Sequence, residues 1–429
     1  MTRPLSVAVA GLGTVGGGVL KLLRDNADIV AARAGRPIAV TAVSARDRNK
    51  DRGVPITGLR WYEDPVALAA DPAVDVIVEL IGGSEGPAKA LVEAAIAAGK
   101  PVVTANKALI AVHGAELAAA EARGVPLAFE ASVAGGIPVI KAIREGLAAN
   151  RVSRIAGILN GTCNYNHTQM RERGREFAEV LADAQKLGYA EADPSFDIDG
   201  IDAAHKLSIL AALAFGRPVA FDAVYVEGIR RISALDIAFA SELGYRIKLL
   251  GIASHTDAGI ETRVHPCMVP QTAPIARVDG VFNAVVAEGD AVGRVMLEGR
   301  GAGAGPTASA VVADLIDIAR NRETPVWGAA AEALSAAPSV PMSAHFGPYY
   351  IRLMVVDRPG VIADVTAALR DHGISLESML QRGRSPGEAV PVVLVTHETR
   401  ESDMREAVAR IAALGTVMEE PTLIRIEAG

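Results

Sequence analysis

Cysteine is scarce in this sequence: the 429 residues include only Cys163 and Cys267, which excludes a disulfide framework. Long basic runs are also missing and the net charge is −7, so nucleic acid is not an expected partner. The longest uncharged apolar stretches, such as residues 207–216, are shorter than the roughly 20 residues of a membrane-spanning helix. A signal peptide is not expected either, because the apolar run at 5–10 is short and ends in a glycine turn. We therefore expect a soluble cytoplasmic protein with no membrane or nucleic-acid partner.

Apolar residues make up half of the chain, and at its start they fall into short runs. Between residues 5 and 130 these runs alternate with Ala-rich helical stretches, as expected for parallel strands covered on both faces. This predicts an α/β fold with an N-terminal Rossmann domain, a doubly wound sheet, over residues 1–130. The predicted strands are Ser6–Ala10, Ile38–Ser44, Val74–Leu80, Pro101–Thr104 and Pro126–Phe129, and the clearest helix is Pro87–Ala98.

The pattern changes near Ala131, where helical stretches come first and strand-like runs follow. This order predicts an α+β catalytic and dimerisation domain with a mixed sheet over residues 131–330. The helix at about 305–321 is a candidate to return to the Rossmann domain. The predicted helices are Val139–Ala148, Glu176–Leu187, Gly200–Phe215 and Thr307–Asn321, and the strands are Val152–Leu159, Arg246–Ser254, Glu261–Cys267, Val281–Ala287 and Val292–Leu297.

Residues 331–348 are rich in proline and glycine, which is typical of a linker. The remaining residues, 349–429, follow the order strand, helix, strand, strand, helix, strand. That order predicts a βαββαβ unit of the ferredoxin-like type.

The clearest cofactor motif is a glycine fingerprint that directly follows the first predicted strand and opens a helix. Its first glycine allows a tight turn, its second lets a pyrophosphate approach the backbone, and its third allows close packing of helix on strand. The helix N-terminus then faces the phosphates. We expect a dinucleotide to contact Gly11, Leu12, Gly13, Thr14, Val15 and Gly16.

The end of the second predicted strand bears on the choice of nucleotide. Arg46 stands first there and Arg48 follows, and arginine suits the 2′-phosphate of NADP. Asp47 keeps NAD open, since an acid at this place binds the ribose 2′-hydroxyl.

An unusual concentration of charge lies between residues 191 and 206. Part of it has a structural explanation, because acids favour a helix N-terminus and Asp202 and Lys206 are spaced i, i+4. That explanation suits Glu191 and Asp193 poorly, since Pro194 separates them from the helix. A lysine among acids near a nicotinamide can act as general acid toward a carbonyl oxygen, and a spare carboxylate can hold an ammonium group. The six residues are Glu191, Asp193, Asp197, Asp199, Asp202 and Lys206.

Three further motifs follow predicted strands. Lys107 follows the fourth Rossmann strand, so it is expected to face the ligand crevice. Glu130 opens a loop of small residues that could turn several carbonyls toward a hard cation, although a turn with a capping acid is the better explanation from the residues alone. Asn160 and Thr162 could donate hydrogen bonds to a substrate carboxylate.

Taken together, these residues resemble homoserine dehydrogenase of the long form with a C-terminal ACT domain. The resemblance covers nearly the whole chain. The two most specific stretches are TANKALI at 104–110 and LGYAEADPSFDIDGIDAAHKL at 187–207, and the others are 11–19, 79–83, 130–140, 158–165 and 301–312. Cys163, Asn166 and His167 depart from the residues usual in that family.

The resemblance implies reversible, NAD(P)H-dependent reduction of L-aspartate 4-semialdehyde to L-homoserine, a step in threonine, methionine and isoleucine biosynthesis. It implies that Lys206 exchanges the proton at the substrate oxygen, that Lys107 assists, and that Asp202 positions Lys206. Glu191 would bind the substrate ammonium with support from Asp197, and Thr162 would line the substrate site. The resemblance also matches Gly305 to a cofactor contact, and it matches Glu130, Val133, Gly135 and Ile137 to a sodium site.

The tail resembles an ACT domain, in which amino acids bind near the turn at Gly360. Threonine is the expected effector, with a tail that only assembles the oligomer as the alternative. A homodimer or a homotetramer is expected.

Two other functions remain open at this point. Cys163 could be the thiolate of a phosphorylating aspartate-semialdehyde dehydrogenase, although Lys206 and its acids would then have no role. The chain could also be a non-catalytic NADP-binding sensor that reports through the ACT unit.

Overall fold

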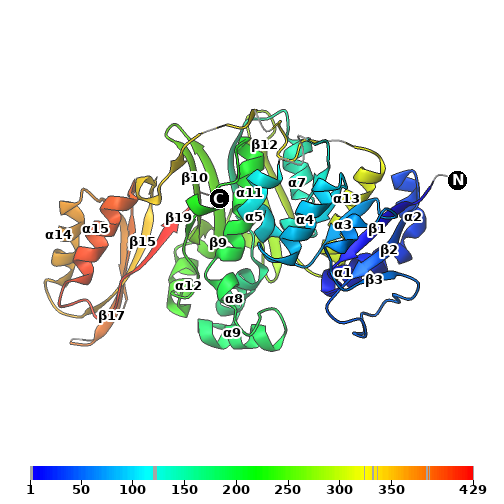
Figure 1. Ribbon diagram of the computed structural model, residues 1–429. Coiled ribbons are helices and arrows are strands. Elements are labelled where there is room, and N and C mark those ends of the chain that lie inside the picture. Colours follow the sequence, from blue (N-terminus) through cyan, green and yellow to red (C-terminus); the bar gives the residue numbers. More distant parts are fainter. Residues whose placement is uncertain are drawn as a thin grey trace.

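The computed structural model describes residues 3–428 except 119–122, 323, 331–332, 336, 383–384 and 386. Three regions follow one another along its length: a Rossmann domain at one end, a central mixed sheet with its helices, and an ACT unit at the other end (Figure 1). Part of the linker predicted at 331–348 lies outside the described residues. No helix in the described part of the chain is long and apolar enough to cross a membrane.

The N-terminal sheet is parallel, with the strand order β3-β2-β1-β4-β5-β6 of a doubly wound fold. Alternate residues of β1 enter two different cores: Val7 and Val9 face α1 and α13, while Ala8 and Ala10 face the α4 and α5 side. This explains why the strand is apolar throughout. Its strands are β1 (Leu5–Ala10), β2 (Ile38–Ser44), β3 (Arg60–Tyr62), β4 (Val76–Glu79), β5 (Val102–Thr104) and β6 (Leu127–Ala128).

Helices cover both faces of this sheet. They are α1 (Thr14–Asp25), α2 (Ala27–Ala34), α3 (Ala67–Ala70), α4 (Pro87–Ala97), α5 (Lys107–Leu117) and α13 (Ala304–Ala319). The last of these follows the strands of the central region in the chain and packs on α1. The approach is so close that a Cβ at Gly18 would lie 2.5 Å from the carbonyl oxygen of Ala304.

The central region packs α11, α8 and α12 against long antiparallel strands. Its helices are α7 (Val139–Lys141), α8 (Gly161–Arg173), α9 (Phe177–Lys186), α10 (Ser195–Ile198), α11 (Ile201–Phe215) and α12 (Ala234–Glu242), with a π-helical turn, η2 (Ala142–Gly146), after α7. Its strands are β7 (Val152–Ile158), β8 (Tyr225–Val226), β9 (Tyr245–Thr256), β10 (Gly259–Pro270), β11 (Phe282–Gly289), β12 (Gly293–Arg300) and β13 (Ser339–Val340). Short 3-10 turns are η1 (Glu130–Ser132), η3 (Phe221–Ala223), η4 (Pro274–Arg277) and η6 (Met342–Ala344).

The C-terminal unit has the predicted βαββαβ order, and α14 and α15 share a core on one face of its sheet. It comprises β15 (Tyr349–Val356), α14 (Val361–Asp371), β16 (Leu376–Gln381), β17 (Ala389–Thr396), α15 (Glu401–Ala412) and β19 (Thr422–Ile426), with the small pair β14 (Phe346–Gly347) and β18 (Thr399–Arg400) beside it. β19 also pairs in parallel with β10, so the central and C-terminal strands form one sheet of 11 strands. The sequence did not predict this continuity.

Candidate active site

A buried carboxylate bridges two lysines where the Rossmann domain meets the central region. Asp202 lies in the first turn of α11, and its Oδ2 accepts a hydrogen bond from Lys206 Nζ at 2.7 Å. Its Oδ1 lies 3.1 Å from the Nζ of Lys107, which begins α5 directly after β5. Lys206 Nζ also donates to the carbonyl oxygen of Leu159, at the end of β7, at 2.7 Å. The two lysines come from different domains and meet on one acid.

Burial and charge act in opposite directions on Asp202. Burial alone would raise the pKa of this carboxyl group, but the ammonium groups of Lys206 and Lys107 outweigh it and lower the pKa below its usual range. Asp202 is therefore ionised throughout the physiological range. Lys107 is also held from its other side, because its Nζ lies 5.6 Å from the centre of the Phe196 ring.

A second acid, Asp197, joins this group through Asn160. The two amide protons of Asn160 reach Asp197 Oδ1 and Asp202 Oδ2, each at 2.8 Å, while its Oδ1 accepts from Cys163 N and caps α8. Burial, reinforced by the charge of Asp202, raises the pKa of Asp197. The side-chain amide of Asn160 therefore makes all its hydrogen bonds within the protein. It holds two carboxylates in place and is not free to bind a substrate carboxylate.

Thr162 lies beside the same group, and the direction of its hydroxyl proton differs from the sequence-based hypothesis. Its Oγ1 donates to the carbonyl oxygen of Tyr189 at 2.8 Å and lies 3.3 Å from Asp197 Oδ2. The proton is therefore directed toward protein acceptors.

The other acids of the cluster lie further out. Glu191 is exposed, and its carboxylate has no hydrogen bond or ion pair with any residue in the described part of the chain. Asp193 accepts from the backbone N–H of Ser195 at 3.1 Å, and Asp199 pairs with Arg230. Asp193 and Asp199 thus shape the turn before α11, while Asp197 and Asp202 line the site.

The glycine turn after β1 has the geometry of a dinucleotide cradle. A Cβ at Gly11 would lie 2.5 Å from the backbone of Leu80, and one at Gly16 would lie 2.1 Å from the oxygen of Gly11. Gly13 is open instead, with nothing within 4 Å of the place its Cβ would take. The first turn of α1 carries no acid. A close-packed turn with one open glycine at a helix N-terminus fits a pyrophosphate.

The neighbouring loops are arranged by Glu79, a buried acid that the sequence analysis did not single out. Its Oε2 accepts from Thr104 Oγ1 at 2.7 Å, and its Oε1 accepts from the backbone N–H groups of Ile81 and Gly82. These bonds tie the end of β4 to the end of β5, three residues before Lys107 begins α5. The signal in the sequence was a single acid, Glu79, in the otherwise uncharged stretch 79–83.

Known protein families and solved structures match this chain over nearly its whole length. Sequence profiles described as "Homoserine dehydrogenase, NAD binding domain", "Homoserine dehydrogenase" and "ACT domain" match residues 11–130, 138–316 and 349–416. The homoserine dehydrogenase of Pseudomonas aeruginosa is 50% identical over 99% of both chains. The crystal structure of a homoserine dehydrogenase from Thiobacillus denitrificans is also 50% identical, covers 99% of both chains and superposes with a TM-score of 0.94.

The chain belongs to the homoserine dehydrogenase family. It is an NAD(P)-dependent oxidoreductase that interconverts L-homoserine and L-aspartate 4-semialdehyde. A hyperthermophilic archaeal homoserine dehydrogenase, 26% identical with a TM-score of 0.63, has been solved in complex with NADPH; it covers 73% of this chain, and 97% of its own chain is matched.

In this homoserine dehydrogenase the cysteine alternative finds no support. Cys163 is buried, and its Sγ donates to the carbonyl oxygen of Asp197 at 3.3 Å. Burial, with the negative charge of Asp197, raises the pKa of this thiol well above its usual value. A nucleophile needs the thiolate, which this environment suppresses.

The cofactor-side residues predicted from the sequence lie around the glycine turn. Gly305 is in the first turn of α13, whose start abuts α1, and its Cα faces open space. Arg46 is exposed after β2 and has no partner among the described residues. Arg48 and Arg52 both lie over the ring of Trp61 at 5.9 Å.

In the loop predicted to bind sodium, the side chain of Glu130 is already hydrogen-bonded within the protein. Both carboxylate oxygens of Glu130 accept backbone N–H groups, from Ile140 at 3.0 Å and Lys141 at 2.9 Å, and so cap α7. Burial and the nearby Asp314 raise the pKa of Glu130 to about 7. Ala134, at φ 52°, turns the chain between the predicted ligands. The side chain of Glu130 is thus occupied by the protein's own backbone.

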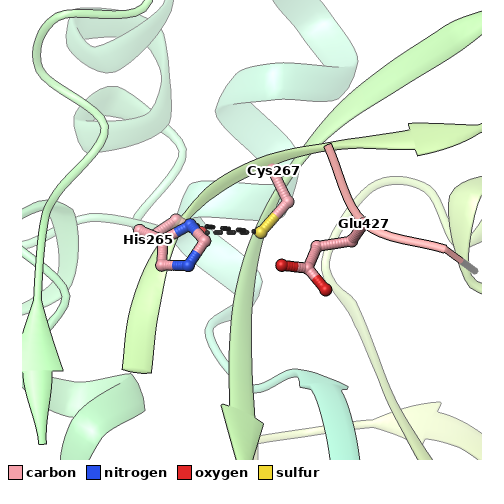
Figure 2. A group of neighbouring side chains, drawn as sticks. All are labelled: His265, Cys267 and Glu427. Carbon is pink, nitrogen blue, oxygen red and sulfur yellow. Dashed lines mark hydrogen bonds between the residues drawn. The ribbon is translucent and has the colours of Figure 1, made fainter. Parts of the chain in front are cut away.

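A different cluster of side chains has the composition of a metal site but not its electrostatics. Figure 2 shows His265 and Cys267 on β10 beside Glu427, and all three are buried. Arg263 donates to Glu427 Oε1 at 2.6 Å and lies 3.0 Å from His265 Nε2. Since a buried guanidinium already neutralises the carboxylate, a metal cation there would be repelled. We interpret the cluster as a structural polar network between β10 and the C-terminal segment.

Proposed function

We propose that Lys206 is the general acid and base of this homoserine dehydrogenase. A lysine ammonium has three N–H donors. Two of those of Lys206 reach Leu159 O and Asp202 Oδ2, which leaves one for the substrate oxygen. This arrangement is the observation that carries the proposal. Two hydrogen bonds hold the ammonium group of Lys206 in place, and its third N–H remains available.

The reaction then follows from the positions of the residues. When bound, the nicotinamide supplies the hydride to the carbonyl carbon of the semialdehyde or takes it back from homoserine. Lys206 gives its free proton to the carbonyl oxygen as that oxygen gains negative charge, and becomes a neutral amine. Lys107, held by Asp202 and Phe196, stabilises the same charge. In the reverse direction Lys206 takes the hydroxyl proton of homoserine.

Different acids serve the two ends of the substrate: Asp202 acts through Lys206 at the carbonyl end, and Glu191 and Asp197 are assigned to the ammonium end. We propose that Glu191 binds the substrate ammonium, because its carboxylate is exposed and unpaired among the described residues, and that Asp197 supports it. Thr162 fits a supporting part in the substrate site, since its hydroxyl proton is directed to Tyr189 O.

Replacement of Lys206 tests the general-acid proposal. In Lys206→Ala we expect kcat to fall by about 10²–10⁴-fold, the range for a general acid or base, while the Kd for NADPH measured by fluorescence stays within twofold. Lys186→Ala, an exposed lysine on α9, is the matched control and keeps the activity of the unmodified enzyme. Turnover in Lys206→Ala at the level of the control would sink the proposal.

NADP is the cofactor we propose, on the strength of Arg46. The guanidinium is exposed at the end of β2 and unpaired among the described residues, so it is available to a 2′-phosphate. Arg46→Ala should raise KM for NADPH about tenfold, a loss of roughly one charge-assisted hydrogen bond, and leave KM for NADH unchanged. Lys21→Ala on α1 serves as control. An equal change in both KM values would contradict the assignment.

We propose two further ligands, a sodium ion and threonine. Sodium would be held by the carbonyl oxygens of Glu130, Val133, Gly135 and Ile137, and replacing sodium by potassium at constant ionic strength tests it. Threonine would bind the ACT unit at the Gly360 turn, where α14 begins with φ 94°. Rates measured with both cofactors, with and without threonine, distinguish an effector site from a tail that only assembles the oligomer.

The oligomer would form through free sheet edges. β12 and β16 are the two ends of the 11-stranded sheet and have no further neighbour in the described part of the chain. We propose a homodimer or a homotetramer, which light scattering on the purified enzyme resolves.

A further inference from the structure

The loop that carries Arg46, residues 46–53, is exposed at every position except Arg52. Its remaining hydrogen bonds are local, as where the carboxylate of Asp47 accepts the N–H of Asn49 at 2.8 Å. Such bonds shape a turn but do not attach it to the domain. In the described part of the chain, the one hydrogen bond that leaves this loop is made by the side chain of Arg52.

The guanidinium of Arg52 joins three backbone carbonyl groups. Its Nε donates to Leu12 O in the glycine turn at 3.2 Å, its Nη1 donates to Lys50 O at 2.5 Å, and its Nη2 donates to Asp47 O. All three nitrogens of the group thus donate to the protein. Because a guanidinium presents its donors in a rigid planar fork, this side chain fixes the distance between the glycine turn and the loop.

Two packing contacts hold Arg52 itself. Its guanidinium carbon lies 5.9 Å from the centre of the ring of Trp61, which belongs to β3. Its backbone oxygen lies 3.5 Å from the place that a Cβ would take at Gly17 of α1. At Arg52 the loop is therefore fixed to the edge of the sheet and to the helix that follows the glycine turn.

The glycine turn does not depend on this attachment. A Cβ at Gly11 would lie 2.5 Å from the backbone of Leu80, so the turn is packed tightly against the residue that follows β4. The bond to Leu12 therefore anchors the loop to the turn, and loss of Arg52 would release the loop while the turn keeps its shape.

We propose that Arg52 is a positioning residue for the choice of nucleotide. It holds the loop so that the exposed guanidinium of Arg46 faces the 2′-phosphate of an NADP molecule bound at the glycine turn. Arg52 does not bind the phosphate in this arrangement, because its own nitrogens are engaged by Leu12, Lys50 and Asp47. This inference rests on the proposed role of Arg46.

Substitution of Arg52 tests the inference through the preference between the two cofactors. In Arg52→Ala we expect KM for NADPH to rise about fivefold, a partial loss of the charge-assisted bond of Arg46, and KM for NADH to change by less than about twofold. Arg52→Lys should behave like Arg52→Ala, since it keeps the charge and loses the fork. Lys50→Ala removes an exposed charge from the same loop and leaves the carbonyl in place, so this matched control should keep both KM values.

A double-mutant cycle separates positioning from direct contact. In the Arg46→Ala background, Arg52→Ala should add no further change in KM for NADPH, because the group that Arg52 positions is gone. Additive effects would show that Arg52 binds the phosphate itself and would overturn the proposal. An equal rise of both KM values in Arg52→Ala, or normal KM values in Arg52→Lys, would overturn it as well.

Amide hydrogen exchange of the cofactor-free enzyme measures the loop directly. Peptides that cover residues 46–53 should exchange faster in Arg52→Ala and Arg52→Lys than in Lys50→Ala, and unchanged exchange contradicts the anchoring. Arg46→Ala alone distinguishes the two proposals. If it raises both KM values equally, the NADP assignment fails and the role of Arg52 fails with it; if it acts on NADPH alone while Arg52→Ala has no effect, only the role of Arg52 is lost.

Discussion

Asp202 shows how one residue can join two domains. Its two oxygens receive Lys206 from the same helix and Lys107 from the Rossmann domain, with Asn160 as a third donor. A buried charge of this kind is tolerated only when it is paired and hydrogen-bonded, and here both conditions hold. The i, i+4 spacing predicted the pair with Lys206. The contact with Lys107, 95 positions earlier in the chain, required the fold.

Substitution of Cys163 distinguishes the lysine mechanism from the alternative in which a cysteine thiolate is the nucleophile. Its thiol is buried and donates to Asp197 O, a bond that a serine hydroxyl can also make. We therefore expect Cys163→Ser to retain at least about half of kcat, with a small loss of stability from the smaller side chain. Steady-state rates with aspartate semialdehyde measure this.

The opposite result would have a definite meaning. If Cys163→Ser lost turnover and the unmodified enzyme formed NADPH in a phosphate-dependent reaction, a thioacyl intermediate on this cysteine would replace the lysine mechanism.

At the scale of elements, strands with continuous apolar sequence were predicted well, whereas the polar helix α8 was missed. The strands β1, β2, β4, β5 and β6 lie where they were expected, because burial on both faces leaves a clear pattern. α8 was not predicted, since its first half carries Gly, Asn and Thr residues, which have low helix propensity. It forms because Asn160 caps it and because its buried polar side chains, such as Asn164, find partners on the segment near Val278.

Two glycines of the turn before α1, Gly13 and Gly16, are expected to respond differently to substitution by alanine. Gly13→Ala should leave folding intact, since its Cβ meets nothing within 4 Å, but should block the approach of the pyrophosphate and raise the Kd for NADPH by at least about tenfold. Gly16→Ala should lower Tm instead, because its Cβ would lie 2.1 Å from a backbone oxygen.

Calorimetry and fluorescence titration of both variants measure these effects. Unchanged NADPH affinity in Gly13→Ala would show that the cofactor does not approach this turn.

At the scale of the whole molecule, the ACT unit is built into the central sheet rather than attached by the linker alone. Parallel pairing of β19 with β10 joins them, and buried ion pairs surround the junction. Arg425 on β19 is 1% exposed and binds Glu401 of α15 and Glu227 of the central region. Arg352 on β15 binds Asp236, which caps α12. Motion of the ACT unit would therefore disturb α12 and β10 directly.

Arg425→Met should destabilise this junction. The substitution leaves the half-buried Glu227 without its cation and the buried Glu401 with Arg405 alone, and breaking a buried pair costs about 3–5 kcal/mol. Scanning calorimetry should show a lower unfolding temperature. The matched control is Arg410→Met, which breaks an exposed pair with Asp371 worth at most about 1 kcal/mol. Equal shifts for the two variants would show that the network does not hold the ACT unit in place.

The sequence by itself determined the order of the three regions, the dinucleotide turn and the membership of Lys206 and Asp202 in one site. These follow from local patterns: apolar runs, glycine spacing and helical periodicity. Only the tertiary structure decided that Asp202 also holds Lys107, that Asn160 serves the protein's own acids, that Glu79 ties two strand ends together, and that two predicted sheets are one. Each of these depends on contacts between residues distant in the chain, and local sequence patterns do not specify which distant segments will meet.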